Sequence, residues 1–155
     1  MSVVVKSLGE DSDQAAVAEC HRVFRCRYMR DPDNETAMRK HIGHHYHIQY
    51  KLLRDYGRDI AAWAQDVLGM VTAAEERVVV GFQCRSGRHR SVACAEMVGA
   101  WLQTRLQSSR HVVYIQHREQ RHDWKRCRMR CRDCDVHVGV TPQNMDLLLA
   151  FIARR

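Results

Sequence analysis

One short run of residues constrains the fold of this chain more than any other part of its sequence. From Arg77 to Cys84 nearly every residue is apolar, and the run begins with the three valines Val78–Val80. An unbroken apolar run of this length is typical of a strand that is covered on both faces in a parallel sheet. Parallel strands are joined by helical crossovers. The run therefore predicts a layered α/β fold with this strand near its centre.

The rest of the chain alternates between the spacing of strands and the spacing of amphipathic helices. We expect further strands at Val3–Ser7, Val23–Met29 and Val112–Gln116. We expect helices over residues 14–20, 91–106 and 144–155, and two more between residues 35 and 70 that separate near Gly57. The sequence thus predicts a small, mostly parallel sheet flanked by helices, with ligands bound at the carboxyl ends of the strands.

We expect the chain to form one globular unit with two parts, because 155 residues suit a single domain. Residues 1–119 make up the predicted α/β domain. Residues 120–155 form a basic, cysteine-rich carboxyl-terminal extension that ends in a helix and packs on the same domain. Trp63, Trp101 and Phe151 recur at apolar positions and are expected in the core.

The charge of the chain favours an anionic partner. The formal net charge is +7, which suits RNA, DNA, a phosphorylated metabolite or an acidic membrane surface. No apolar run reaches the ~20 residues that a membrane-spanning helix needs, so no membrane insertion is expected. The seven cysteines are an odd number, and the amino terminus carries no secretory signal, so we expect a reducing cytoplasmic or otherwise intracellular setting.

The run CRSGRHRS, Cys84–Ser91, links the apolar strand to the next helix. Backbone N–H groups of such a loop converge on a small hollow, and the helix dipole adds positive charge there, so the loop suits a phosphate group. Gly87 lets the backbone curl closely around a ligand. Arg90 has a fork of donors that can hold two phosphate oxygens, and His89 and Ser91 offer further donors.

The same spacing permits a second interpretation. A cysteine followed by five residues, an arginine and a serine is the arrangement of cysteine-dependent phosphatases. Cys84 would then be the nucleophile, Arg90 the phosphate clamp, and Asp31 or Asp33 the general acid. Gln83 argues against this role, because phosphatase signatures usually have a histidine at that position. A buried strand-end cysteine without a catalytic role is the simpler alternative, and we expect binding without catalysis.

The chain contains four segments, Ser7–Gly9, Cys26–Pro32, Val80–Glu96 and Val112–Arg118, which in this order resemble the carboxyl-terminal domain of the RapZ family of bacterial RNase adapter proteins. The run VGFQCRSGRHRSVACAE, Val80–Glu96, is similar to the family's strand, cysteine, glycine-rich loop and His-Arg-Ser-Val sequence. Ser7–Gly9 resembles its Ser-Phe-Gly, and Cys26–Pro32 its Val-Arg-Phe-Leu-Pro-Asn-Pro segment. Val112–Arg118 is similar to its last strand and the His-Arg pair that follows.

The resemblance implies an α/β binding domain whose bacterial members bind an amino-sugar phosphate and small regulatory RNA. The family usually has Thr-Gly-Gly where this chain has Arg85, Ser86 and Gly87, so the loop is more basic here. No Gly-Lys-Ser phosphate loop like that of the family's amino-terminal domain occurs, so ATP hydrolysis is not expected, and isolated domains of this kind could form homo-oligomers. The implied pocket, with the other residues of the loop, comprises Arg27, Cys84, Arg85, Ser86, Gly87, Arg88, His89, Arg90 and Ser91, with His117 and Arg118 at its rim.

Two features of the extension suggest additional binding. Cys127, Cys131, Cys134 and His137 are close enough in sequence to bind zinc, although zinc sites usually have two better-separated pairs. The alternative is an exposed basic loop with reduced cysteines. Within residues 118–132, Trp124 could stack on an RNA base, and RNA phosphates could be bound by the basic residues Arg121, Lys125, Arg126, Arg128 and Arg130. Such a charge run is often only a solvated surface.

A histidine-rich stretch lies before the predicted core helices. His41, His44, His45 and His47 occur at helical spacings, and His41 and His45 lie four residues apart. That spacing suits a metal site in principle. Since no acidic or cysteine partner occurs nearby at helical spacing, we interpret the stretch as a polar face of a helix.

Overall fold

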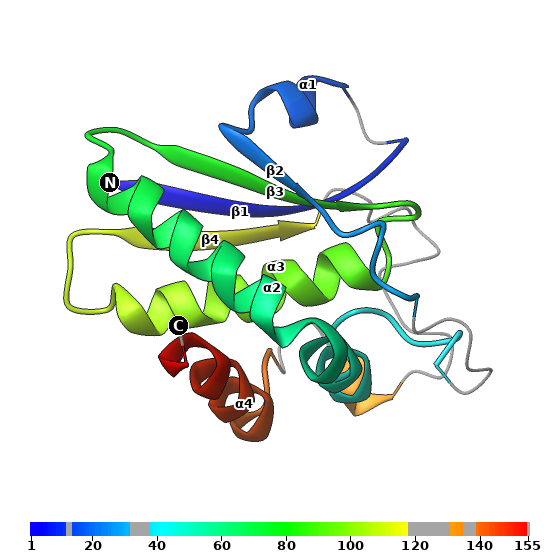
Figure 1. Ribbon diagram of the computed structural model, residues 1–155. Helices are drawn as coiled ribbons and strands as arrows, with labels where there is room; N and C mark the ends of the chain where they lie inside the picture. Colours follow the sequence, from blue (N-terminus) through cyan, green and yellow to red (C-terminus); the bar gives the residue numbers. More distant parts are fainter. Residues whose placement is uncertain (12–13, 32–37, 118–130, 135–138, 155) are drawn as a thin grey trace.

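The structure is a computed structural model that describes residues 1–11, 14–31, 38–117, 131–134 and 139–154. In chain order its elements are β1 (Ser2–Gly9), α1 (Gln14–Ala18), β2 (Arg22–Arg25), α2 (Tyr46–Ala73), β3 (Val78–Cys84), α3 (Arg90–Arg105), β4 (Val112–His117), the short 3₁₀ helix η2 (Arg132–Cys134) and α4 (Pro142–Ala153). Figure 1 shows the sheet as one layer, with α2 and α3 below it and α4 farther from the sheet.

The described strands form one parallel sheet in the order β2-β3-β1-β4. The α/β prediction is therefore confirmed, and β3 is an interior strand as expected. Across the sheet, the chain moves in one direction from β1 to β2 and in the opposite direction from β2 to β3 and from β3 to β4. Because crossovers are right-handed, α1 lies on one face of the sheet and α2 and α3 on the other (Figure 1). The strand order reverses between β1 and β3, and this is the place where open α/β sheets bind ligands.

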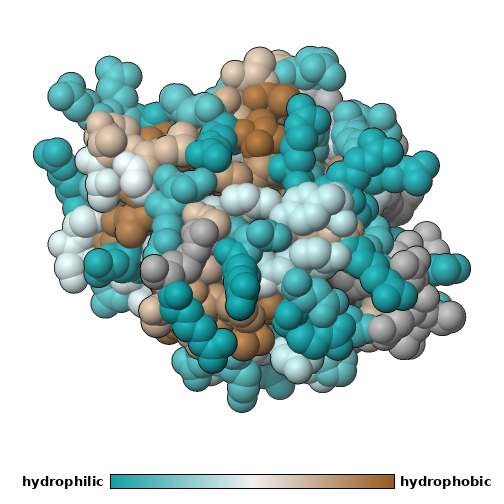
Figure 2. Space-filling view, in the orientation of Figure 1, coloured by the Kyte–Doolittle hydropathy of each residue, from teal (hydrophilic) through white to brown (hydrophobic). Residues whose placement is uncertain are grey.

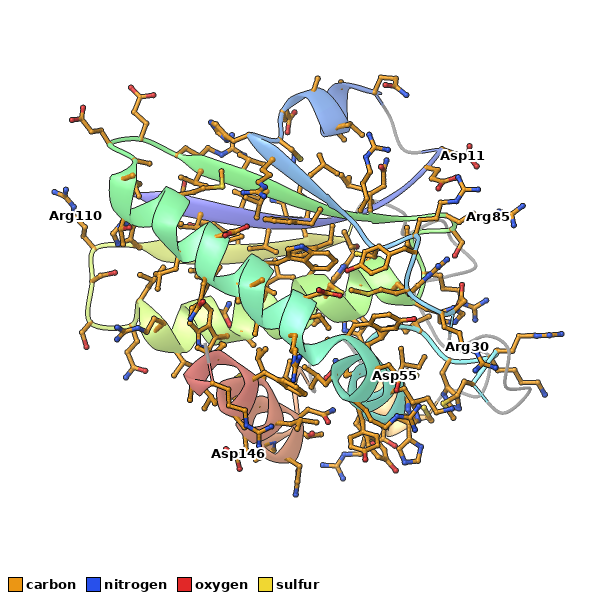
Figure 3. The ribbon with its side chains drawn as sticks, in the orientation of Figure 1. Asp11, Arg30, Asp55, Arg85, Arg110 and Asp146 are labelled. Carbon is orange, nitrogen blue, oxygen red and sulfur yellow. The ribbon has the colours of Figure 1, made fainter. Side chains whose placement is uncertain are left out.

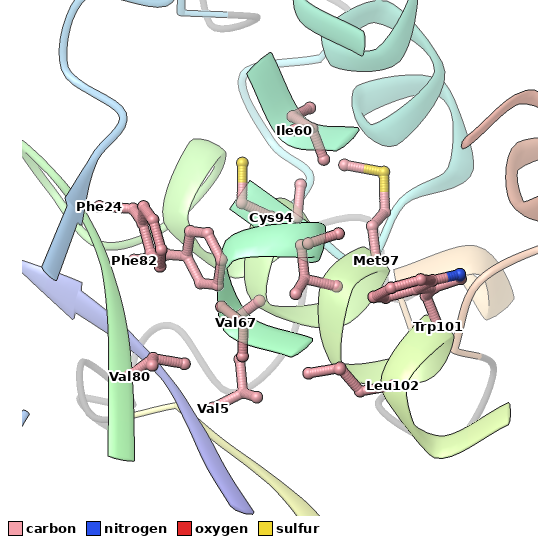
Figure 4. Packing of buried hydrophobic residues seen from close by; sticks show 14 of the residues in the cluster. Val5, Phe24, Ile60, Val67, Val80, Phe82, Cys94, Met97, Trp101 and Leu102 are labelled. Carbon is pink, nitrogen blue, oxygen red and sulfur yellow. The ribbon is translucent and has the colours of Figure 1, made fainter. Parts of the chain in front are cut away.

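The core lies between the sheet and the two long helices (Figure 4). Val5 of β1 and Val80 and Phe82 of β3 are fully buried there, facing Val67 of α2 and Met97 of α3. Trp101 is buried in this core, and Trp63 and Phe151 pack against it, as the sequence predicted. Burial of both faces of β3 explains why its sequence contains almost no polar residues.

Besides small shifts at the ends of other elements, three predicted features differ in the structure. The strand expected to continue to Met29 ends at Arg25, because the chain turns there and the Met29 N–H donates to the Cys26 carbonyl at 3.1 Å. The break expected near Gly57 is a kink at Tyr56 within one helix, α2. A Cβ on Gly57 would lie 2.2 Å from the Phe151 ring of α4, so the glycine allows α4 to approach the kink closely.

The third difference concerns the histidines. Helix α2 begins only at Tyr46, with His45 as its N-cap, so His41, His44 and His45 are not on a helix face. Residues 38–45 instead form turns that pack beside the end of β3 and the start of α3. The prediction of a polar helix face was therefore wrong, because tertiary contacts of this segment replace helical hydrogen bonds.

The surface in the orientation of Figure 1 mixes hydrophilic side chains with small, separated apolar patches (Figure 2). Exposed large apolar residues, such as Tyr28, Tyr50 and Leu149, come from different elements. Among the helices that the structure describes, none combines the length and the apolar character needed to cross a membrane.

Candidate functional site

The loop between β3 and α3 lies where the sequence predicted a ligand. Cys84 ends β3, five residues follow, and α3 begins at Arg90. The loop after β1 lies beside it, since the Glu10 N–H donates to the Arg85 carbonyl at 3.1 Å and the Gln83 side-chain amide donates to the Gly9 carbonyl at 3.2 Å. Asp11 and Arg85 lie at the same end of the molecule, whereas Arg110 lies at the opposite end (Figure 3). The loop is therefore at the switch point of the sheet.

The backbone of the loop is curved, and its helix is not capped by a side chain. Gly87 has φ 68°, a left-handed conformation that glycine adopts without strain. His89 is the N-cap residue of α3, but its side chain makes no capping hydrogen bond. Helical hydrogen bonding starts with the Ala93 N–H, which donates to the His89 carbonyl at 2.9 Å. The N–H groups of the preceding turn have no partner within the helix, and such helix ends bind anions.

Arg90 does not extend toward solvent. Its Nη1 donates to the Arg27 and Met29 carbonyls, each at 2.9 Å, and its Nη2 lies 3.0 Å from a carboxylate oxygen of Asp31. The side chain is almost completely buried. Arg90 therefore fixes the segment after β2 against the start of α3. Within the described chain its Nε is buried without a hydrogen-bond partner.

His89 connects the same carboxylate to the histidine-rich turns. Its Nε2 lies 2.7 Å from the His41 carbonyl, and because a carbonyl only accepts, Nε2 is the donor and carries a proton. Its Nδ1 lies 3.3 Å from Asp31. Asp31 thus bridges His89 and Arg90 within the site, a contact that the sequence did not predict.

The accessible positive charges lie at the rim of the loop. Arg27 is 69% exposed in its side chain and lies 3.1 Å from Glu10. Arg85 is exposed, and Ser86 and Arg88 are half-buried. Arg88 donates to the Lys40 carbonyl at 3.1 Å, and its own carbonyl accepts from the Gly43 N–H at 3.0 Å. Arg118, which the resemblance places at the rim, lies outside the described residues.

Cys84 lies beneath the loop and is 1% exposed. Its thiol donates to the Ser91 hydroxyl at 3.2 Å, and Ser91 is fully buried. Among the residues of the phosphatase hypothesis, the Cys84 sulfur is covered, Asp31 is paired with Arg90, and Asp33 lies outside the described residues.

His117 is half-buried and belongs to a polar network that the sequence did not predict. Its Nδ1 lies 2.7 Å from the Ser7 hydroxyl, and its Nε2 lies 2.7 Å from Glu96. His44 lies 3.4 Å from the same Glu96 oxygen. Ser7 and His117 are register partners at the ends of β1 and β4, so their pairing could have been anticipated from the strand ends. The network ties β4 to β1 and α3, and its ligand-type atoms lie close enough together to hold a metal.

The predicted metal residues are only partly described. Cys127 and His137 lie outside the described residues, whereas Cys131 and Cys134 lie beside His41. Burial lowers the pKa of His41, and burial together with the neighbouring His41 lowers the pKa of His45 to about 4. The imidazole rings are therefore neutral near pH 7, the form in which histidine binds metals.

A doubly wound α/β domain with a strand–loop–helix element at its switch point is the class of protein that this fold and site define. The model of one family, the RapZ C-terminal domain, matches residues 1–121 of the 155-residue chain, and the chain belongs to this family. A comparison with curated proteins gives no match. The matched region contains the whole sheet and the loop, whereas η2 and α4 lie beyond it.

Proposed function

We propose that this chain is a RapZ-like adapter module that binds a phosphorylated ligand, such as a phosphorylated sugar, over residues Cys84–Ser91. The observation that carries this proposal is the uncapped start of α3 at the switch point of the sheet. The first turn of a helix offers N–H donors and a partial positive charge, and an anion satisfies both. The family relation supports the adapter role.

The charges around the loop support an anionic ligand. Arg85, Arg27 and Arg88 lie at its rim, and the whole chain carries a net charge of +7. Arginine pairs well with phosphate because its planar fork matches two oxygens at once. The rim arginines are expected to meet the ligand, and the buried Arg90 is expected to hold the loop in shape from below.

A compact ligand fits the described residues better than a long RNA strand does. The donors gather at one loop and one helix end, which suits a single phosphate group. Most of the basic run that suggested RNA binding, residues 118–132, lies outside the described residues. Binding of RNA in place of a sugar phosphate is the alternative outcome of the binding experiment.

The test compares phosphorylated and unphosphorylated ligands by isothermal titration calorimetry at fixed ionic strength. We expect glucosamine 6-phosphate and inorganic phosphate to bind and glucosamine not to bind. Arg85→Ala should weaken phosphate binding by about tenfold or more, since a hydrogen bond to a charged group contributes roughly 1.5–3 kcal/mol. Arg110→Ala removes the same charge at the opposite end of the molecule and should change the affinity little (Figure 3).

Three results would contradict the proposal. Equal losses in Arg85→Ala and Arg110→Ala would show that only the net charge matters. Binding of a short RNA without binding of either phosphate compound would replace the sugar phosphate with RNA. Turnover of an aryl phosphate that Cys84→Ser abolishes would instead support the phosphatase hypothesis, whereas we expect no turnover and intact phosphate binding in that variant.

A further inference from the structure

Two short sequence pairs, far apart in the chain, meet beside the candidate site. One pair is His41 and His45, which have three residues between them, and the other is Cys131 and Cys134, which have two. Nδ1 of His41 lies 3.2 Å from the sulfur of Cys131 and 3.2 Å from the sulfur of Cys134. The ligand atoms of His41, His45 and Cys131 all lie within 4.8 Å of one another.

We propose that His41, His45, Cys131 and Cys134 bind one structural zinc ion that fastens the carboxyl-terminal extension to the turns beside the ligand loop. Two cysteines and two histidines form the ligand set of many structural zinc sites, with pair spacings of the kind seen here. In the sequence, the cysteines have no second, well-separated pair of ligands close to them. The fold supplies that pair from residues 38–45.

The distances from His41 to the two cysteine sulfurs are close to those of a tetrahedral zinc site. Zinc–sulfur bonds of about 2.3 Å and zinc–nitrogen bonds of about 2.0 Å place neighbouring nitrogen and sulfur ligands about 3.5 Å apart at the tetrahedral angle. The two nitrogen–sulfur distances of 3.2 Å around His41 are close to this value. Two sulfur and two nitrogen ligands favour zinc over the harder cations, which prefer oxygen ligands.

The surroundings also suit a structural site. Cys134 is almost completely buried, and Ile42 and Cys131 pack against it in a small apolar cluster separate from the main core. Nε2 of His45 lies 3.9 Å from a carboxylate oxygen of Asp133, and carboxylates commonly orient zinc-bound histidines. So small a cluster contributes little hydrophobic stabilisation of its own. Metal binding would add free energy that stabilises the folded segment.

His45 is expected to contribute least among the four ligands. Its Nδ1 accepts a hydrogen bond from the His47 N–H at 3.2 Å and so caps α2. A metal that bound this nitrogen would remove the cap, which offsets part of the gain. The two cysteines and His41 carry no comparable helix cap, so their substitution should have the larger effect.

The metal content of the purified, untagged full chain tests the proposal. After dialysis, elemental analysis should find about one zinc per chain, the stoichiometry of a single four-ligand site. Replacing zinc with Co²⁺ should give the thiolate-to-cobalt charge-transfer and tetrahedral d–d absorption bands, a readout that needs no variant.

Matched variants locate the site. Cys131→Ser, Cys134→Ser and His41→Asn should each reduce bound zinc to about a tenth or less of the parent value, since even outer-shell changes weaken metal sites about 10–100-fold. Cys20→Ser and His111→Asn, which change the same residue types away from the site, should retain the metal. Circular dichroism of each variant checks that the fold persists.

Three outcomes would overturn the proposal. In the first, the parent neither contains zinc nor gives the cobalt bands. In the second, Cys127→Ser and His137→Asn remove the metal while His41→Asn retains it, so that the ligands come from the extension alone. In the third, mass spectrometry without reductant finds Cys131 and Cys134 joined as a disulfide in metal-free protein. None of these outcomes depends on phosphate binding at Cys84–Ser91.

Discussion

The carboxylate of Asp31 offsets part of the positive charge in the candidate site. Its carboxylate lies 3.0 Å from Arg90 and 3.3 Å from His89, so two basic side chains of the loop already face an anion from the protein itself. A phosphorylated ligand must bind beside this carboxylate or displace it. Asp31 is therefore expected to weaken the binding of a second negative charge, although it also orders the buried end of the site.

Replacing Asp31 tests this balance. Asp31→Asn removes the negative charge with little change in size, so the affinity for inorganic phosphate should rise about fivefold or more, since like charges at short range repel strongly in a partly buried site. Calorimetry at fixed salt measures the change. Asp66→Asn on α2, where Asp66 pairs with Arg22, is the control for net charge and should have little effect. Weaker binding in Asp31→Asn would show instead that Asp31 mainly holds the loop in shape.

The residue types of the site could be predicted from the sequence, but their partners could not. Cys84, Gly87 and the start of the helix lie where the run CRSGRHRS indicated. Arg90 bonds to the Arg27 and Met29 carbonyls because the chain turns after Arg25, and no local pattern records that turn. Glu96 was missed because no local pattern places it beside His117, whereas the contact of Ser7 with His117 follows from the alignment of β1 with β4.

At the scale of elements, the turns over residues 38–45 are the part that local patterns described worst. Their histidine spacing resembled a helix, but the Gly43 N–H bonds to the Arg88 carbonyl at 3.0 Å instead of to its own segment. Long apolar elements such as β3 and α3 were predicted well, because their burial dictates both composition and period. A short polar segment takes its conformation from its neighbours.

Two glycines provide a matched test of this packing. A Cβ on Gly43 would lie 2.3 Å from the His89 carbonyl oxygen and 2.5 Å from the Ala93 nitrogen, whereas a Cβ on Gly69 in α2 would meet nothing within 4 Å. Gly43→Ala should therefore reduce the free energy of unfolding by about 2 kcal/mol or more, because backbone must move. Gly69→Ala should raise it by roughly 0.5–1 kcal/mol through helix propensity. Urea unfolding measures both, and equal effects would show that Gly43 is not tightly packed.

At the scale of the whole molecule, the parallel sheet determines where chemistry can occur. The reversal of strand order between β1 and β3 brings the loops after both strands to one end of the molecule, and the arginines of the rim are there because β3 and β2 end there. The sequence allowed this end to be predicted from fold class alone. It did not allow the pairing of residues 38–45 with residues 131–134 to be predicted, since about 90 residues separate His41 from Cys131.

The burial of the cysteines provides a probe of the whole fold. Cys26, Cys84 and Cys94 are at most 1% exposed, and a hydrogen bond to Cys94, together with burial, raises the pKa of Cys26 well above its usual value. Iodoacetamide should therefore modify the half-buried Cys20 in native protein while these three thiols react only upon unfolding, all over one range of urea concentration. Mass spectrometry measures each site. Rapid native labelling of Cys84 would show that its sulfur is accessible after all.

His41 contacts both the ligand loop and the carboxyl-terminal extension. Its backbone carbonyl receives the hydrogen bond from His89, and its ring lies against the sulfurs of Cys131 and Cys134. A movement of His41 would therefore alter contacts both with the ligand loop and with the segment beyond the family's matched region. If a metal and a phosphate compound each prefer one position of His41, thermodynamic linkage requires each to alter the affinity of the other by the same factor. The extension would then adjust the sensitivity of the module without contacting its ligand.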